Sequence, residues 1–178
     1  FHKISNSKIT LLAFLVFLVF SGLTLPVENR KLEEYSLGAG SADTTLFYSA
    51  ADLAKMAEVY GEEGRNSYLQ ARWTFDLAFP LVYTFFLVTA ISYLLGKSFP
   101  EDSKFRLLNL VPLAAMVFDL LENTAVSLVM GRYPVPCPPG LLLAPIFTPV
   151  KWLLVSSSFL ILLLSLILFF WRKLQPHK

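Results

Sequence analysis

Four stretches of hydrophobic residues, each long enough to cross a membrane, alternate along the chain with shorter polar segments. The hydrocarbon core of a bilayer is about 30 Å thick and requires roughly 20 apolar residues in a helix. This pattern predicts an all-α membrane protein, a bundle of four transmembrane helices that forms one domain over residues 1–178. The four predicted spans cover about 9–27, 73–95, 107–130 and 150–171.

The first stretch shares one feature with signal peptides, because Lys3 and Lys8 precede it. No small-x-small cleavage site follows Leu25. We therefore expect a retained helix. Since this stretch contains no charged residue, we expect it at the periphery of the bundle or against a partner.

The polar segment 28–72 contains a predicted short amphipathic helix. Ser49 is a suitable N-cap with Asp52 three residues later, as in a capping box, and Gly61 is a suitable stop. We expect this helix to lie on the membrane surface or over the mouth of the bundle, and a lid or a docking surface is the functional alternative. A second helical start at 62–65 is expected to run directly into the second span.

Prolines mark several expected interruptions. The loop GRYPVPCPPG has four prolines in ten residues and is predicted to be non-helical. Pro80 and Pro112 are expected to kink the second and third spans and to free backbone carbonyls. Pro145 and Pro149 are expected to set the start of the fourth span, whose apolar pattern also permits a start at Leu141.

Composition agrees with a membrane protein and removes several classes of site. The chain is 55% hydrophobic and 16% charged, which is more apolar than soluble domains usually are. The net charge of +2 gives no reason to expect nucleic-acid binding. Cys137 is the single cysteine, so no internal disulfide can form. His2 and His177 lie at the chain ends, which leaves no histidine for a metal or acid–base site in the interior.

The distribution of lysine and arginine predicts an orientation. Short segments on the cytoplasmic side of a membrane are enriched in these residues. The 28–72 segment also contains lysines and arginines, but they are spread over a long sequence with many acidic residues. We therefore predict cytoplasmic termini, with 28–72 and 131–140 outside, in a bacterial inner membrane. The predicted cytoplasmic flanks contain Lys3, Lys8, Lys97, Lys104, Arg106, Arg172, Lys173 and Lys178.

The third predicted span has polar residues near its centre, in the run FDLLENTAV. Asp119 precedes Glu122 by three residues and Asn123 by four, so the three side chains share one helix face. With a rise of about 1.5 Å per residue, Asp119 lies near the middle of the span and the other two lie toward its outer side.

Two other spans place charges in the same outer half of the bilayer. Asp76 follows Arg72 by four residues, which permits a direct pair. Lys151 in the fourth span lies at a depth that matches Asp76. An unpaired charge in hydrocarbon costs about 2.5–3.5 kcal/mol or more. We therefore predict that these groups point into the bundle, where they pair with one another, with serines or with water.

These observations define a polar cluster with three alternative roles. It is a buried ion-pair network that fixes helix register, or a polar cavity that binds a lipid head group or small amphiphile and uses a carboxylate as general acid or proton relay. Its oxygens also suit Mg²⁺ or Ca²⁺, but no spacing is diagnostic, and we predict neither a metal nor a cofactor. The polar cluster consists of Arg72, Asp76, Asp119, Glu122, Asn123 and Lys151.

The run YGEEGRNSYLQARWTFDLAFPLVYTFFL, followed by FDLLENTAV and TPVKW, resembles a group of small bacterial four-span membrane proteins. The shared pattern is Gly-Arg-x-x-Tyr, then an Asp and Phe-Pro in the second span, Asp-x-x-Glu-Asn in the third and a Lys in the fourth. The resemblance covers most of the chain. It implies an architecture and the location of a site, and no activity.

In layout alone, the chain is also similar to emopamil-binding and sigma-2 type membrane proteins. These are compact bundles with acidic residues in a cavity of sterol size. Their isomerase members use an intramembrane histidine together with the acids. The predicted spans here contain no histidine, so the resemblance does not extend to sterol isomerisation.

The leading hypothesis from the sequence is a small integral membrane protein without catalytic activity, acting as an accessory subunit of a larger membrane assembly. Its small size and the 28–72 segment favour this role. The alternative is a lipid- or amphiphile-binding protein or enzyme that uses Asp76, Asp119 and Glu122, and the third hypothesis is a proton-coupled carrier. Expected partners are membrane lipids and other membrane subunits or a second copy, and no nucleic acid.

Overall fold

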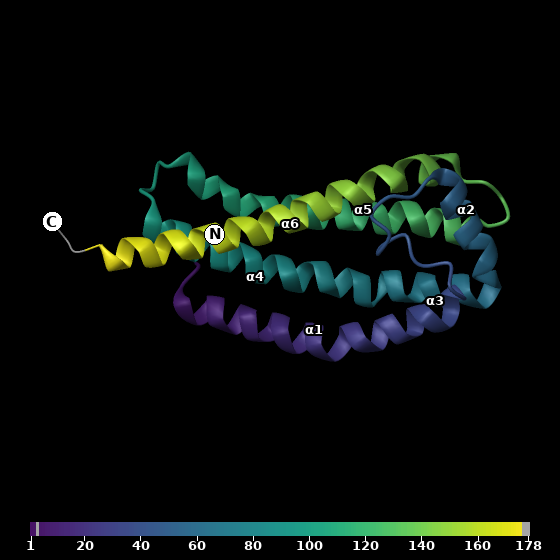
Figure 1. Cartoon of the computed structure of the whole chain (residues 1–178), viewed down its shortest axis with the longest axis horizontal. Helices are drawn as coiled ribbons and strands as arrows, with labels where there is room; N and C mark the ends of the chain where they lie inside the picture. The colour runs from purple at the N-terminus through teal and green to yellow at the C-terminus, as the bar shows by residue number, and fades with distance from the viewer. Residues whose placement is uncertain (3, 176–178) are drawn as a thin grey trace.

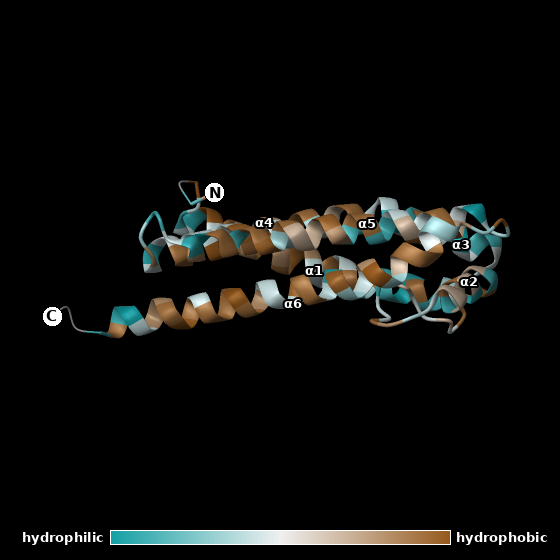
Figure 2. Ribbon diagram, turned by 90° about the horizontal axis from the view of Figure 1, so that it is seen from above, coloured by the Kyte–Doolittle hydropathy of each residue, from teal (hydrophilic) through white to brown (hydrophobic). Residues whose placement is uncertain are grey.

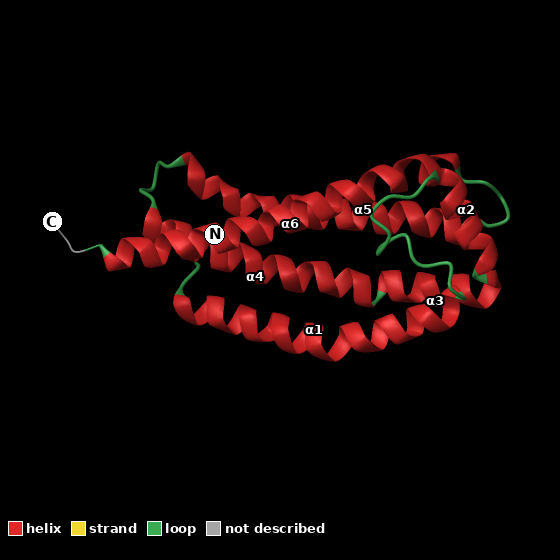
Figure 3. Ribbon diagram, in the orientation of Figure 1, coloured by secondary structure: helices red, strands yellow, loops and turns green. Residues whose placement is uncertain are grey.

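A computed structural model describes residues 1–2 and 4–175, and these residues form helices joined by loops (Figures 1 and 3). Four helical segments are long and apolar enough to cross a membrane. They confirm the predicted all-α fold with four spans and indicate an integral membrane protein. The elements are α1 (Ser7–Ser36), α2 (Ala50–Val59), α3 (Gly61–Trp73), α4 (Phe75–Ser98), the 3-10 helix η1 (Lys104–Leu110), α5 (Val111–Arg132) and α6 (Pro138–Leu174).

The bundle has two distinct ends. Helices α2 and α3 and the loop 37–49 lie at one end, and the first residues, the α4–η1 turn and the C-terminal part of α6 lie at the other (Figure 1). Hydrophobic residues dominate the length between these ends (Figure 2). The two ends of the described chain are therefore on the same side, as an even number of spans requires. Which side faces the cytoplasm stays a prediction, and Lys3 and Lys178 lie outside the described residues.

Helices α5 and α6 form the most extensive helix pair, and their backbones approach closely at Gly140. A Cβ atom on this residue would lie 2.6 Å from the Ala125 carbonyl oxygen and 2.7 Å from the Val129 Cγ2 atom. Only glycine lets the two backbones approach to this distance. Gly140 thus fixes the position of α6 across α5, ten residues before the cluster residue Lys151.

Helix α1 is peripheral, as the absence of charge in its apolar stretch predicts. Only Ala13 and Ser36 of this helix are buried. Its contacts with α4 are largely aromatic: the Phe17 ring stacks on Phe86 with centroids 5.2 Å apart, and Phe20 stacks on Phe75 at 6.0 Å. Helix α1 therefore packs along α4 through one face and leaves most of its side chains on the outside.

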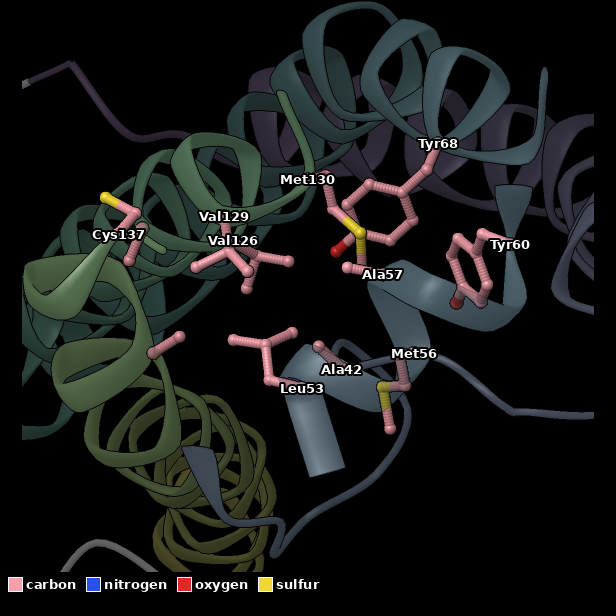
Figure 4. Packing of buried hydrophobic residues seen from close by; sticks show 12 residues of the cluster. Ala42, Leu53, Met56, Ala57, Tyr60, Tyr68, Val126, Val129, Met130 and Cys137 are labelled. Atoms are coloured by element: carbon pink, nitrogen blue, oxygen red, sulfur yellow. The ribbon is translucent and has the colours of Figure 1, made fainter. Parts of the chain in front are cut away.

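The predicted short helix between the first two spans is α2, and its capping box is confirmed. The Ser49 N–H donates to Asp52 Oδ2 at 2.8 Å, and the Asp52 N–H donates to Ser49 Oγ at 3.2 Å. Helix α2 covers the end of the bundle, where Leu53 points toward Val126 and Val129 of α5 (Figure 4). Of the two predicted locations, the structure has the one over the bundle mouth.

The predictions for several prolines are wrong. The fourth span begins at Pro138, so Pro145 and Pro149 lie inside α6 rather than at its start. The segment 138–140, expected to be non-helical, forms the first turn of this helix. Proline is well tolerated there because the first N–H groups of a helix have no intrahelical partner. Pro112 likewise lies in the first turn of α5 and does not kink its middle.

Helix α3 was expected to run directly into α4, but the two helices are separate. A break at Thr74 separates them, with φ −119° and ψ −79°. The two helices still form one long helical segment, Gly61–Ser98, in which α4 is apolar and α3 is polar. At the opposite end of the bundle, the His2 ring lies 2.9 Å from the Ser92 carbonyl oxygen and 3.0 Å from that of Arg106. This histidine is far from the polar cluster.

Candidate functional site

All six residues of the polar cluster meet inside the bundle, at the end covered by α2 and α3. Arg72 comes from α3, Asp76 from α4, Lys151 from α6 and the other three from α5. Each of the six is between 0% and 8% exposed. The prediction that the charges point into the bundle is confirmed. The high cost of a charge facing lipid explains the arrangement.

The ammonium group of Lys151 is surrounded by carboxylates. Its Nζ atom lies 2.5 Å from Asp43 Oδ1, 2.6 Å from Glu122 Oε2 and 3.8 Å from Asp119 Oδ1. One oxygen from each of these three acids lies within 4.8 Å of the other two. Three close carboxylates often bind a metal ion, but here the Lys151 ammonium occupies the position between them. The geometry therefore favours an ion-pair network over a metal site.

The guanidinium group of Arg72 forms the second centre of charge. Its Nε atom lies 2.7 Å from Asp76 Oδ2, which confirms the pair predicted from their spacing. Its Nη1 atom lies 3.6 Å from Asp43 Oδ1 and donates to Asn123 Oδ1 at 3.5 Å. The guanidinium carbon also lies 4.7 Å from the centroid of the Tyr68 ring, a cation–π distance.

Asn123 connects α5 to a backbone carbonyl that Pro80 leaves free. Pro80 has no N–H to donate to the residue four positions earlier, which is Asp76. The Asn123 side-chain amide fills this place and donates to the Asp76 carbonyl oxygen at 3.1 Å. The expectation that Pro80 frees a carbonyl is confirmed, and the polar residue that satisfies it is a member of the cluster.

Two expected contacts are absent among the described residues. Lys151 has no ion pair with Asp76, because Asp43, Asp119 and Glu122 surround its ammonium group. The serines of the fourth span do not join the cluster either. Ser158 is buried but donates to the Leu154 carbonyl oxygen at 2.7 Å, within its own helix.

Sequence reasoning missed two members of the site. Tyr83 donates its hydroxyl to Asp119 Oδ2 at 3.2 Å. It follows Asp76 by seven residues, two helical turns along the same face, so this spacing could have revealed it. Asp43 comes from the loop 37–49, where nothing in the sequence indicates its position. Its backbone oxygen also accepts a hydrogen bond from Trp152 Nε1 at 2.9 Å.

A cavity of about 290 Å³ lies beside the polar cluster, between α1, α4, α6 and the loop 37–49. Its polar wall includes Arg72, Asp76, Asp119 and Lys151, whereas Glu122 and Asn123 lie behind it. Most of the remaining wall is apolar or aromatic. This part consists of Phe17, Leu25, Leu32, Tyr35, Ala71, Phe75, Phe79, Pro80, Tyr83, Trp152, Val155 and Phe159.

A second hollow, of about 490 Å³, lies between the C-terminal part of α1 and α3. Its wall includes exposed polar residues such as Glu63 and Gln70, and none of the six cluster residues lines it. The smaller cavity is therefore the one in which the buried charges can contact a ligand.

The Asp43 carboxylate attaches the loop 37–49 to the cluster. Closure of this loop is therefore expected to depend on the charge of Asp43, which leads to a prediction about pH. Burial alone would raise the pKa of Asp43, but Lys151 and Arg72 outweigh it and lower the pKa to about 2. A carboxyl whose pKa is lower in the folded state stabilises that state above its ordinary pKa, and this contribution is lost as the pH falls through the folded value. We expect the loop to stay closed at about pH 4, where an ordinary aspartate is half protonated.

Hydrogen exchange of the 37–49 amides, corrected for intrinsic rates, measures this closure. Protection is expected to be equal at pH 7 and pH 4 in the native chain. In Asp43→Asn, exchange at both pH values is expected to be about tenfold faster, as for the loss of one charge-assisted hydrogen bond of roughly 1.5 kcal/mol. Asp102→Asn, an exposed site at the other end, is the matched control. Unchanged exchange in Asp43→Asn would show that the Asp43 carboxylate does not hold the loop closed.

The chain was compared with protein-family models, curated proteins and solved structures, and no match was found in any of the three. The resemblance to small four-span bacterial proteins therefore stays a prediction. The site combines a buried charged cluster, a loop held across it by Asp43, and an adjoining cavity whose wall is partly charged and largely apolar.

Proposed function

We propose that this protein binds a membrane amphiphile in the cavity beside the polar cluster. The observation that supports it is one cavity with two kinds of wall: Asp76 and Asp119 at one part, and aromatic and aliphatic side chains over most of the rest. Ligand pockets are commonly apolar with a few convergent polar groups that orient the ligand. The polar head of the amphiphile lies at the carboxylates, and the tail lies along Phe17, Val155 and Phe159.

The boundary between α1 and α6 supports entry of the tail from the side. Phe17 of α1 and Phe159 of α6 both line the cavity, and their ring centroids are 6.3 Å apart. Helix α1 buries only two of its residues in the bundle. A tail can therefore enter between α1 and α6 if a few aromatic rings change position.

Other parts of the site favour binding over catalysis. Glu122, a suggested catalytic carboxylate, is fully buried, contacts Lys151 and does not line the cavity. It therefore supports the ion-pair network that holds the cavity wall. The accessory-subunit and carrier hypotheses stay predictions, and co-purification of a stoichiometric partner through mild detergent or transport in vesicles would support them.

Quenching of Trp152, which lines the cavity, tests the proposal. The chain has three tryptophans, and the other two, Trp73 and Trp171, do not line the cavity. Trp73→Phe/Trp171→Phe leaves Trp152 as the only reporter. Dodecyl chains brominated near the head group, with trimethylammonium, maltoside or sulfate heads, are added to this variant in bilayer nanodiscs. We expect at least one of them to quench Trp152 saturably and to be displaced by its unbrominated form.

A variant that fills the cavity makes the result specific. Val155→Phe, in the same background, is expected to weaken binding about tenfold or more, since overpacking typically costs about 1–3 kcal/mol. Leu153→Phe adds the same ring two residues away, where the side chain is 67% exposed and does not line the cavity. It is expected to bind as well as the parent. Quenching that never saturates, or that Val155→Phe leaves unchanged, would contradict the proposed function.

A further inference from the structure

We propose that the head group of the bound amphiphile contains a positively charged nitrogen, held by the carboxylates of Asp76 and Asp119. This inference rests on the proposed function and specifies the class of its ligand. It follows from the balance of charge in the site, from the atoms that face the cavity, and from the aromatic rings beside them.

The site contains more negative than positive charge. Two cations, Arg72 and Lys151, share their ion pairs with four carboxylates. When all four acids are ionised, two negative charges remain unbalanced in a buried site, where charge without a counter-ion is costly. The four carboxylates belong to Asp43, Asp76, Asp119 and Glu122.

The two cations are already occupied. Lys151 contacts three carboxylates. The Arg72 guanidinium contacts Asp43, Asp76 and Asn123 and lies over the Tyr68 ring. An anionic head group would have to displace these acids and would add to the excess of negative charge. A cationic head group requires neither change.

The carboxylate of Asp76 has a cation beside it but receives no hydrogen bond at its Oδ2 atom. Its side chain is only 9% exposed. Arg72 Nε forms an ion pair with its Oδ2 atom at 2.7 Å, but neither atom makes a hydrogen bond with a described residue. Asp119 receives one hydrogen bond, from Tyr83, and its nearest cation, Lys151 Nζ, is 3.8 Å away. Both acids therefore retain lone pairs for a donor or cation in the cavity.

The rings beside these carboxylates suit an ammonium group. Phe75, Phe79 and Tyr83 form a row along α4, with successive centroids 5.4 Å and 5.7 Å apart, and all three line the cavity. Trp152 lines it from α6. Aromatic faces next to carboxylates are the usual surroundings of alkylammonium ligands, because the ring quadrupole attracts the cation while the ring also contacts its methyl groups.

Competition in the single-tryptophan chain distinguishes head groups that share one tail. Unbrominated dodecyltrimethylammonium, dodecyl maltoside and dodecyl sulfate, each corrected for its partition into the nanodisc, compete with the brominated probe that binds best. We expect trimethylammonium to bind at least about tenfold more tightly than the other two, since one buried charge pair is worth that much or more. Asp119→Asn, which keeps an oxygen to accept from Tyr83, is expected to remove this preference.

Two controls and the remaining outcomes complete the test. Asp102→Asn, an exposed change of the same chemistry, is expected to keep the preference. Tetramethylammonium, a head without a tail, is expected not to compete; if it competes equally well, the ammonium site stands and the amphiphile proposal fails. Equal binding of all three heads, or tightest binding of the sulfate, overturns the ammonium proposal and leaves amphiphile binding intact. Absence of saturable binding overturns both.

Discussion

Replacing Lys151 with methionine is expected to lower the free energy of unfolding by about 3–5 kcal/mol, the usual cost of removing one partner from a buried ion pair. The loss is large because Lys151 is only 2% exposed and its Nζ atom contacts the carboxylates of Asp43, Asp119 and Glu122. Methionine fills most of the same volume, so the change removes the charge with little effect on packing. Reversible unfolding in mixed micelles measures the difference.

Two further variants identify the cause of that loss. Lys97→Met removes an exposed lysine at the opposite end of the bundle and is expected to change stability by less than about 0.5 kcal/mol. Lys151→Met/Glu122→Gln also neutralises the fully buried carboxylate and is expected to recover part of the stability. If the single variant is as stable as the native chain, Lys151 is not the counter-ion that the geometry indicates. If the double variant recovers nothing, Glu122 is not its main partner.

The parts of the site that could be predicted depend on spacing within one helix. Asp119, Glu122 and Asn123 share a face because residues three and four apart are neighbours on a helix. Arg72 and Asp76 pair for the same reason, even though the break at Thr74 lies between them. The cost of an exposed charge in lipid then requires these faces to turn inward. Local periodicity and one solvation argument therefore place all six residues.

The parts that could not be predicted depend on tertiary contacts. Asp43 lies in a loop without periodicity, and only the folded chain brings its carboxylate to Lys151. The cavity lies where α1, α4, α6 and the loop 37–49 meet, so its existence depends on how these distant segments pack. The start of the fourth span was misplaced because α6 begins at Pro138, where proline fits the first turn, and continues through Pro145 and Pro149 inside the helix. Packing and context decide these features, and the sequence pattern does not contain them.

The charges of the site divide into two groups with different expected roles. The first group is Glu122, which is fully buried and does not line the cavity. The second group lines the cavity and includes Asp43, Arg72, Asp76, Asp119 and Lys151. The first group is expected to affect stability alone. The second is expected to affect both stability and binding, so variants of Arg72 connect the structural and the functional proposals.

Replacing Arg72 with leucine is expected to cost about 3–5 kcal/mol of stability, because it leaves the buried Asp76 carboxylate without its counter-ion. Arg72→Lys is expected to recover only part of this, since an ammonium group lacks the planar fork that contacts Asp76 and Asn123 together. Arg132→Leu, at the exposed end of α5, is the matched control and is expected to be nearly neutral. Full recovery in Arg72→Lys would show that charge alone matters at this position.

Arg72→Leu also predicts a change in ligand response that a purely structural role would not produce. Removal of the guanidinium increases the excess of negative charge beside Asp76, so an ammonium head group becomes the only cation available to that carboxylate. A ligand that binds only the folded state stabilises it by mass action. Sub-micellar dodecyltrimethylammonium is therefore expected to raise the stability of Arg72→Leu more than that of the native chain, whereas dodecyl maltoside is expected to act equally on both. An equal effect of the two amphiphiles on the variant would assign Arg72 and Asp76 to the fold alone.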